Sequence, residues 1–229
     1  MALIEMKNVK KQYTSGDDVV EALRGVDISI EGGEFISIMG QSGSGKSTLL
    51  SVLGGLNHPS SGEVGVAGIN LYELAGEKLA DFRAQNLGFV FQSFHLISYL
   101  TAIENVMLPL AIVKMTPKAK KEAARKSLER VGLGNKLDRL PNQLSGGEQE
   151  RVAIARAIVN NPYIILADEP TGNLDSATSK EVMALLKELN GVGQTIVMVT
   201  HNPENGSYSD RTITLKDGMV MGQMQYESR

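Results

Sequence analysis

The segment FISIMGQSGSGKSTLLSVLGGL (residues 35–56) joins a short apolar run to a longer one through a loop of glycine and serine. The first run predicts a strand and the second a helix. A strand, glycines and a helix start direct several backbone N–H groups and the positive helix end into one space, which suits a polyphosphate. An ordinary glycine-rich turn is the alternative, but the strand and helix around the loop favour phosphate binding. The residues expected to contact a nucleotide are Gly40, Ser42, Gly43, Ser44, Gly45, Lys46, Ser47 and Thr48.

Short apolar runs alternate with helical patterns along the chain, which is typical of βαβ units around a largely parallel sheet. Four runs are almost continuously apolar, as expected of strands that helices cover on both faces. They are residues 35–40, 87–92, 163–168 and 195–200. The other strand-like runs predict a second, smaller antiparallel sheet. They are residues 3–9, 26–30 and 63–68, and a hairpin over 211–221 that turns at Asp217-Gly218.

Residues 93–143 have a different pattern and predict a helical insert. The segment from Pro117 to Leu133 is rich in helix formers, and Thr116 followed by proline is a helix start. We therefore expect one domain over residues 1–229. Its parallel core and antiparallel sheet take residues 1–92 and 160–229, and its helical subdomain takes residues 93–159.

Composition excludes several classes of protein. The net charge is −3, with 23 basic and 26 acidic residues, so nothing indicates nucleic acid as a partner. The absence of cysteine excludes disulfides and thiolate metal sites and fits a cytosolic protein. The N-terminus lacks the pattern of a secretory signal, and no run approaches the ~20 apolar residues of a membrane span. A role at a membrane would need another chain to supply the spans.

Asp168 and Glu169 follow the apolar strand YIILA (163–167) directly. Ligands bind at the carboxyl ends of strands in such sheets, where the glycine-rich loop also lies. Asp168 is expected beside Ser47, where the two would bind Mg²⁺, and Glu169 is expected to position or deprotonate an attacking water. The alternative, a solvated strand end before a turn, loses weight beside the phosphate loop.

The segment QLSGGEQERVAIARAIV (143–159) predicts a helix that starts near Gly147, with Ser145 at or near its N-cap. Two glycines there leave the terminal amides open to an anion. Taken alone, this is equally an ordinary capping sequence.

Together, these motifs resemble the ATP-binding cassette (ABC) ATPases across essentially the whole chain. The resemblance is carried by GQSGSGKS, Gln92, LSGGE, ILADEP, GNLD and His201, in that family's order. It implies the α/β fold of a P-loop NTPase, with a mainly parallel core sheet, a small antiparallel β subdomain and a helical signature subdomain. It also implies ATP and Mg²⁺ as cofactors.

The resemblance also assigns roles to single residues. It implies that Tyr13 stacks on adenine, that Gln92 contacts Mg²⁺ and senses a membrane partner, and that His201 holds the γ-phosphate and attacking water. Glu169, His201, Lys46 and Gln92 would then be the catalytic set, with Ser47, Gln92 and Asp168 at the metal. Each has a plainer alternative: a strand-end aromatic for Tyr13, a strand terminator for Gln92 and a loop histidine for His201.

In this family the signature of one subunit caps the nucleotide on the other. The resemblance therefore implies an ATP-sandwich homodimer in which Ser145, Gly146, Gly147 and Glu148 contact the partner's ATP. Asp175 would lie in the loop that links the subunits, although a helix cap in NLDSAT explains it equally well.

Narrower features are similar to the ATPases of macrolide exporters and lipoprotein-releasing systems. This similarity implies that a separate membrane subunit exists and that the chain lies against it on the inner face of the cell membrane. It also implies that ATP-driven closure is transmitted to that subunit as mechanical work. His95, Leu96 and Tyr99 would lie near the face that receives that subunit, although His95 is equally explained as an exposed loop residue. A regulator of cell-wall hydrolases in cell division is an alternative. A DNA-repair ATPase is less favoured, because neither heptads nor cysteines are present.

Two departures from the family pattern are visible. Asn202 stands where many relatives have aspartate, which leaves the geometry of the His201 loop and residues 203–210 open. Glu148 and Glu150 replace glutamines often seen in LSGGQQQR. We expect activity to be retained, because these acids do not remove the signature amides.

Overall fold

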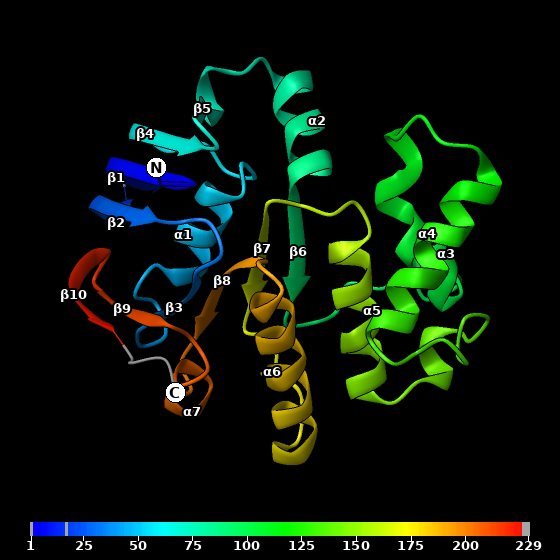
Figure 1. Cartoon of the computed structure of the whole chain (residues 1–229). Coiled ribbons are helices and arrows are strands. Elements are labelled where there is room, and N and C mark those ends of the chain that lie inside the picture. Colours follow the sequence, from blue (N-terminus) through cyan, green and yellow to red (C-terminus); the bar gives the residue numbers. More distant parts are fainter. Residues whose placement is uncertain (1, 17, 226–229) are drawn as a thin grey trace.

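The computed structural model describes residues 2–16 and 18–225, arranged as two sheets and a helical lobe (Figure 1). The larger sheet has the order β10-β9-β3-β8-β7-β6, and all its pairs are parallel except β9 with β10. Its strands are β3 (Phe35–Met39), β6 (Leu87–Phe91), β7 (Ile164–Asp168), β8 (Thr195–Thr200), β9 (Arg211–Lys216) and β10 (Met219–Gln225). The four strands predicted for a parallel core are therefore confirmed.

The hairpin over residues 211–221 forms as predicted, but its assignment to the smaller sheet is wrong. Asp217 and Gly218 both have positive φ, which suits a two-residue hairpin turn. Strand β9 pairs in parallel with β3, with Ile213 opposite Ile38, and Ile213 is fully buried. The hairpin therefore extends the core sheet, because β9 buries its apolar residues beside β3.

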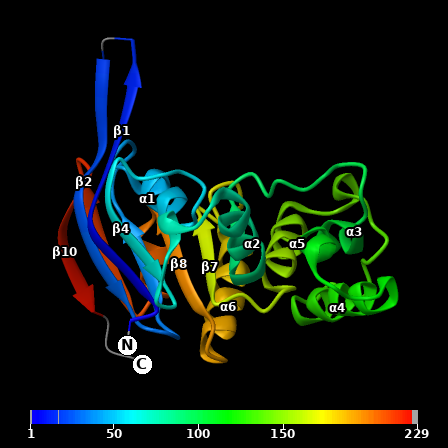
Figure 2. The same cartoon turned by 90° about the horizontal axis from the view of Figure 1, so that it is seen from above.

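The smaller sheet is antiparallel, in the order β2-β1-β4-β5. Its strands are β1 (Ile4–Ser15), β2 (Asp18–Ile30), β4 (Ser61–Val66) and β5 (Ile69–Asn70). Strands β1 and β2 are longer than predicted, and these two paired strands extend away from the rest of the molecule (Figure 2). The first four residues of β2 are all exposed and only Leu23 is buried among residues 18–25, which explains why an apolar pattern did not predict this extension.

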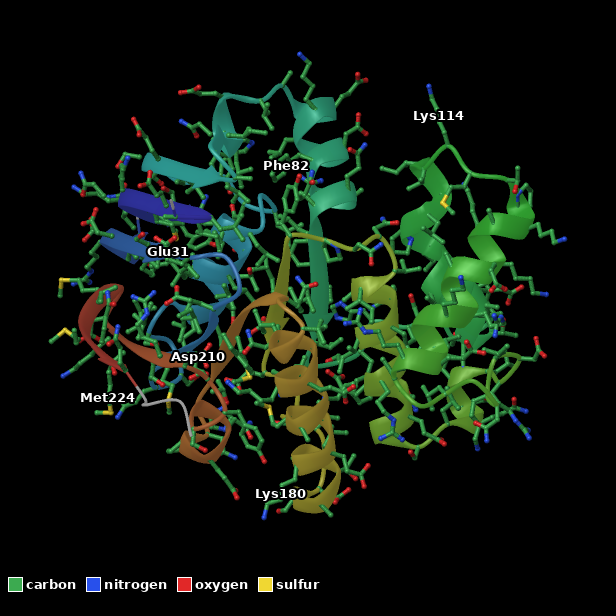
Figure 3. All side chains as sticks on the ribbon, in the orientation of Figure 1. Glu31, Phe82, Lys114, Lys180, Asp210 and Met224 are labelled. Carbon is green, nitrogen blue, oxygen red and sulfur yellow. The ribbon has the colours of Figure 1, made fainter. Side chains whose placement is uncertain are left out.

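The helices pack in two groups. They are α1 (Lys46–Leu53), α2 (Gly76–Asn86), α3 (Ala102–Met107), α4 (Pro117–Arg130), α5 (Gly146–Ile158), α6 (Ser176–Gly191) and α7 (Pro203–Gly206), with 3-10 turns η1 (Leu71–Glu73), η2 (Leu108–Ile112) and η3 (Pro141–Gln143). One core lies between the two sheets around α1 and includes Phe82 of α2, whereas the other joins the opposite face of the core sheet to α3–α6. Lys114 and Lys180 extend outward from the body (Figure 3).

The helical insert forms as predicted, and α4 begins at Pro117 with the Thr116 hydroxyl accepting from Ala119 N. Helices α3, α4 and α5 lie at the end of the molecule opposite the antiparallel sheet (Figure 2). Helix α5 packs on β6 of the core sheet as well as on α3 and α4. These contacts do not divide the chain at one place, so the subdomain boundaries at residues 92 and 160 stay a prediction. No helix within the described residues is long and apolar enough to cross a membrane.

Candidate functional site

The glycine-rich loop connects β3 to α1 as the sequence predicts. Gly45 is the N-cap of α1 with φ 100°, and no side chain in the described part of the chain caps this helix. A Cβ on Gly45 would lie 2.4 Å from the Ala22 carbonyl oxygen, so only glycine fits there. The first amides of α1 therefore remain open to an anion.

Lys46 is the first residue of α1, directly after the glycine-rich loop, and is only 8% exposed. Its Nζ donates to the carbonyl oxygens of Gly40 at 2.8 Å and Gln41 at 3.0 Å. These two bonds hold the Lys46 ammonium inside the loop. When a phosphate binds, the ammonium can donate to a charged phosphate oxygen in place of these neutral carbonyl oxygens, which makes a stronger hydrogen bond.

The loop opens into a cavity of ≈ 980 Å³, large enough for a nucleotide. Strand β2 supplies one wall and the carboxyl ends of the core strands supply another. The lining residues are Val20, Glu21, Ala22, Met39, Gly40, Gln41, Ser42, Gly43, Gly45, Lys46, Ser47, Thr48, Gln92, Asp168, Glu169, His201 and Thr214. The structure thus brings together the phosphate loop, both carboxylates, Gln92 and His201, but not Ser44, whose buried hydroxyl has no partner among the described residues.

Asp168 ends β7 directly beside the phosphate loop. The Ser47 hydroxyl donates to Asp168 Oδ1 at 3.2 Å, which is the predicted neighbour pair. Burial raises the pKa of Asp168, and the adjacent Glu169 carboxylate raises it further, while the Ser47 hydrogen bond lowers it. A cation at this place would offset the cost of burying the carboxylate.

Glu169 and His201 face each other across the ends of β7 and β8. His201 Nδ1 lies 2.8 Å from Glu169 Oε2 and 3.0 Å from Oε1. Glu169 has φ 50° and is 16% exposed in its side chain, against 66% for His201. The pair is therefore arranged so that the carboxylate is fixed and the imidazole is open to the cavity.

The loop after His201 has a definite geometry, which the sequence left open. Asn202 caps α7 by accepting from Glu204 N at 2.9 Å. One turn later, Asn205 Nδ2 donates to Thr171 Oγ1 at 2.6 Å, and both side chains are buried. This bond ties the His201 loop to the loop that follows Glu169. Sequence reasoning missed it, because its partners belong to different strand ends.

We expect Asn205→Ala to destabilise the protein by about 1–3 kcal/mol, because it leaves the Thr171 hydroxyl buried without a partner. Urea unfolding measures the change. The double replacement Asn205→Leu with Thr171→Val removes both polar groups and should recover most of the loss. Equal losses in the single and double variants would show that the hydrogen bond is not responsible.

Gln92 follows β6 and lines the cavity, and its backbone is held by a residue that the sequence did not single out. Asn173 Nδ2 donates to the Gln92 carbonyl oxygen at 2.9 Å. The segment after Glu169 therefore contacts both the Gln92 loop and the His201 loop.

Tyr13 does not belong to the cavity lining. It lies on β1, 41% exposed, opposite Val20 of β2, and Val20 does line the cavity. Residues opposite each other in an antiparallel pair share a face of the sheet, so Tyr13 lies beside the cavity wall.

The signature segment forms the predicted helix, with Ser145 as the N-cap of α5. Glu148 N donates to Ser145 Oγ at 3.2 Å and Ser145 N to Glu148 Oε2 at 2.9 Å, which is a capping box. The Ser145 amide and then Lys136, at 3.4 Å, lower the pKa of Glu148. None of residues 145–148 lines the cavity of its own chain.

Packing also accounts for part of this segment. A Cβ on Gly147 would lie 2.2 Å from Thr178 Cγ2 of α6. Asp175 is the N-cap of α6, accepting from the amides of Ala177 and Thr178 at 3.0 Å each. The helix-cap explanation of Asp175 is thus confirmed, and a role between subunits stays a prediction.

A family model described as ABC transporter matches residues 23–172 of this chain. The chain belongs to the ABC transporter family. This cassette is 50% identical over 219 residues to an uncharacterized ABC transporter ATP-binding protein of Methanocaldococcus jannaschii, covering 96% of this chain and 98% of that one. It is 48% identical to a macrolide export ATP-binding/permease protein of Rhodopirellula baltica, covering 95% of this chain but only 32% of the relative. The cassette therefore spans about a third of that relative's length.

Among solved structures, the cassette is similar to a dimeric ABC transporter cassette, with a TM-score of 0.90 and 46% identity over 99% of this chain and 100% of the other. A second structure of such a cassette, in a post-hydrolysis state with ADP and Pi, has a TM-score of 0.90 and 45% identity, with coverage of 99% and 100%. The α/β fold of a P-loop NTPase and the assignment as an ABC ATPase are thereby confirmed.

Proposed function

We propose that this chain is the Mg²⁺-dependent ATPase subunit of a transporter and binds ATP in the cavity at the start of α1. The observation that carries the proposal is the shared cavity wall. It places the open amides of α1 and Lys46 beside the Ser47–Asp168 and Glu169–His201 pairs. This arrangement fits phosphoryl transfer to water, in which positioning and charge stabilisation do most of the work.

The donor set fits Mg²⁺. Ser47, Asp168 and Gln92 all line the cavity and offer oxygen ligands, which Mg²⁺ prefers. No group of three or more His, Cys, Asp or Glu side chains within residues 2–16 and 18–225 could hold a metal by itself. Mg²⁺ usually binds through one or two carboxylates plus substrate phosphates, so it would bind with ATP. Its chemistry would be to neutralise charge on the β- and γ-phosphates.

In this proposal the residues divide the hydrolytic step among themselves. Lys46 and the α1 amides hold the phosphates, and the hydroxyls of Ser42 and Thr48, which also line the cavity, contact them. Glu169 orients the attacking water and takes its proton, while His201, held against Glu169, contacts the water and the γ-phosphate. The leaving group is ADP, and water adds to the γ-phosphorus.

We further propose that two copies sandwich two ATP molecules. Ser145, Gly146, Gly147 and Glu148 lie outside the cavity of their own chain, yet the N-terminus of α5 offers amides to an anion. A second copy would bring these amides to the γ-phosphate. Solved dimers of similar cassettes support this arrangement.

The partner that receives the work is proposed to be an integral membrane protein. The loop after β6 holds His95, Leu96 and the 78% exposed Tyr99. Arg156 of α5 donates to the carbonyl oxygens of Phe94 and His95, both at 2.6 Å, so this loop is anchored to the signature helix. Docking of a membrane partner on this loop can therefore be transmitted through α5 to the ATP site. The chain would then lie in the cytoplasm, peripheral to the inner face of the cell membrane. The macrolide export ATP-binding/permease protein of Rhodopirellula baltica, of which this chain covers 32%, supports a role in export.

The experiment is to tag the chain in its host, trap the ATP state with Glu169→Gln, and identify co-purifying membrane proteins by mass spectrometry. We expect one membrane protein to be enriched over a Lys46→Ala sample, in which the ATP state does not form. If cell-wall hydrolases co-purify with that membrane protein, the function is regulation of cell-wall hydrolases and not transport. ATP-dependent dimers without any membrane protein would contradict both.

A further inference from the structure

The loop after α1 is attached to the part of β1 that carries Tyr13. Ser60 N donates to the Lys10 carbonyl oxygen at 2.7 Å, and Gln12 N donates to Ser60 Oγ at 2.9 Å. Between these two contacts, Lys11 Nζ donates to the His58 carbonyl oxygen at 2.7 Å. Three consecutive residues of β1 are therefore fixed to this loop immediately before Tyr13.

The Tyr13 ring itself is fixed at two points. Asn57 Nδ2 donates to the Tyr13 hydroxyl oxygen at 2.7 Å. Lys11 Nζ lies 5.0 Å from the centre of the ring and thus over one of its faces. The hydroxyl contact limits rotation of the phenol, and the ammonium occupies one face. Because Lys11 occupies this face and Tyr13 is 41% exposed, a planar ligand would stack on the opposite face.

Asn57 is in turn anchored to the end of α1. The Tyr72 hydroxyl shares its one proton between two acceptors, the Asn57 carbonyl oxygen at 2.7 Å and the Val52 carbonyl oxygen of α1. Burial raises the pKa of Tyr72, so this hydroxyl stays protonated and remains a donor. The His58 ring packs on Tyr72 with centroids 4.8 Å apart. Asn57 therefore sits on a support continuous with the helix whose other end is the phosphate loop.

We propose that Asn57 is a positioning residue for the nucleotide base and acts by holding the Tyr13 ring at the cavity wall. This inference rests on the proposed ATP site and on the role that the family resemblance implies for Tyr13, which is stacking on adenine. Helix α1 then sets both ends of the ligand: its N-terminus holds the phosphates, and the loop at its C-terminus fixes the base platform. The fixed spacing favours a ligand with both a base and a triphosphate, because ordering Tyr13 in advance lowers the entropy cost of binding.

The test compares ATP with tripolyphosphate, which lacks the base, as Mg²⁺ complexes titrated by calorimetry. We expect Asn57→Ala and Tyr13→Phe each to weaken ATP binding by roughly 3–10-fold, the equivalent of one hydrogen bond, and to leave tripolyphosphate binding unchanged. The double variant should lose no more than either single one. Asn57→Asp should restore ATP affinity, because its carboxylate accepts from the Tyr13 hydroxyl, but not in the Tyr13→Phe background. Asn135→Ala, the same substitution at an exposed asparagine that does not line the cavity, is the matched control.

The outcomes separate the two levels of the proposal. If Tyr13→Ala leaves ATP affinity unchanged, the proposed role of Tyr13 itself is wrong. If Tyr13→Ala weakens ATP but Asn57→Ala does not, Asn57 does not position the ring. Equal losses for ATP and tripolyphosphate would show that Asn57 acts only on the fold. Should Asn57→Ala not fold, Tyr13→Phe and Asn57→Asp still decide the question.

Discussion

Glu169→Gln is expected to lower the rate of ATP hydrolysis by about 10²–10⁴-fold, the usual contribution of a general base. Glutamine keeps the size of the side chain and can still hydrogen-bond to His201, whose Nδ1 lies 2.8 Å from Glu169 Oε2. It cannot take a proton from water. The variant should therefore bind ATP normally but hydrolyse it far more slowly. Phosphate release measures the rate, and binding of a fluorescent ATP analogue measures affinity.

Two variants serve as controls for this result. Glu181→Gln changes a carboxylate that pairs with Arg151 at 3.1 Å and does not line the cavity, so turnover should be unchanged. His201→Ala removes the partner of Glu169 and should also slow hydrolysis while leaving the base in place. Unchanged turnover in Glu169→Gln would mean that another group activates the water, and the role given to Glu169 would be wrong.

The features that sequence predicted best are those formed by neighbours in the chain. The strand, glycine loop and helix of residues 35–56 are contiguous, and their order fixes the phosphate loop. The capping box of Ser145 and Glu148 lies within four residues. Local backbone preferences decide such elements, so the residues alone are enough.

The features that sequence missed depend on pairing between distant segments. Whether the 211–221 hairpin joins the core or the small sheet is decided by β3, which lies far back in the chain. The Asn205–Thr171 and Asn57–Tyr13 hydrogen bonds likewise join side chains from separate elements. Asparagine in a loop carries many possible roles, so its type and position did not indicate these partners.

Glu150 of α5 is the least expected side chain in the signature helix, and it predicts an unusual dependence of stability on pH. It is 0% exposed, and neither carboxylate oxygen has a hydrogen-bond partner among the described residues. Burial raises the pKa of Glu150 to about 8, although Arg156 opposes this. The folded protein therefore keeps Glu150 protonated at neutral pH, because an unpaired buried charge costs several kcal/mol.

The direction of the effect follows from proton binding. In the unfolded chain a glutamate loses its proton near pH 4.3, whereas the folded chain keeps it until about pH 8. Between these values the folded state binds more protons, so the Glu150 contribution to the free energy of unfolding falls as pH rises, by up to about 1.4 kcal/mol per pH unit. Above about pH 8 the stabilising contribution of protonated Glu150 is fully lost, and below about pH 4 it is fully present.

Glu150→Gln should remove this contribution and raise stability at pH 8 by several kcal/mol relative to the unchanged chain. Glutamine is neutral at every pH and nearly the same size, and it is also the residue often seen at this place in the family. Thermal unfolding by circular dichroism from pH 5 to 8 measures the effect, and the difference in stability between the two chains should widen as pH rises.

Glu148→Gln is the matched control on the same helix. Because the pKa of Glu148 is lowered, its contribution is present above the unfolded pKa and lost as pH falls, the opposite sign. Parallel curves for Glu150→Gln and the unchanged chain would show that Glu150 is already ionised in the folded protein.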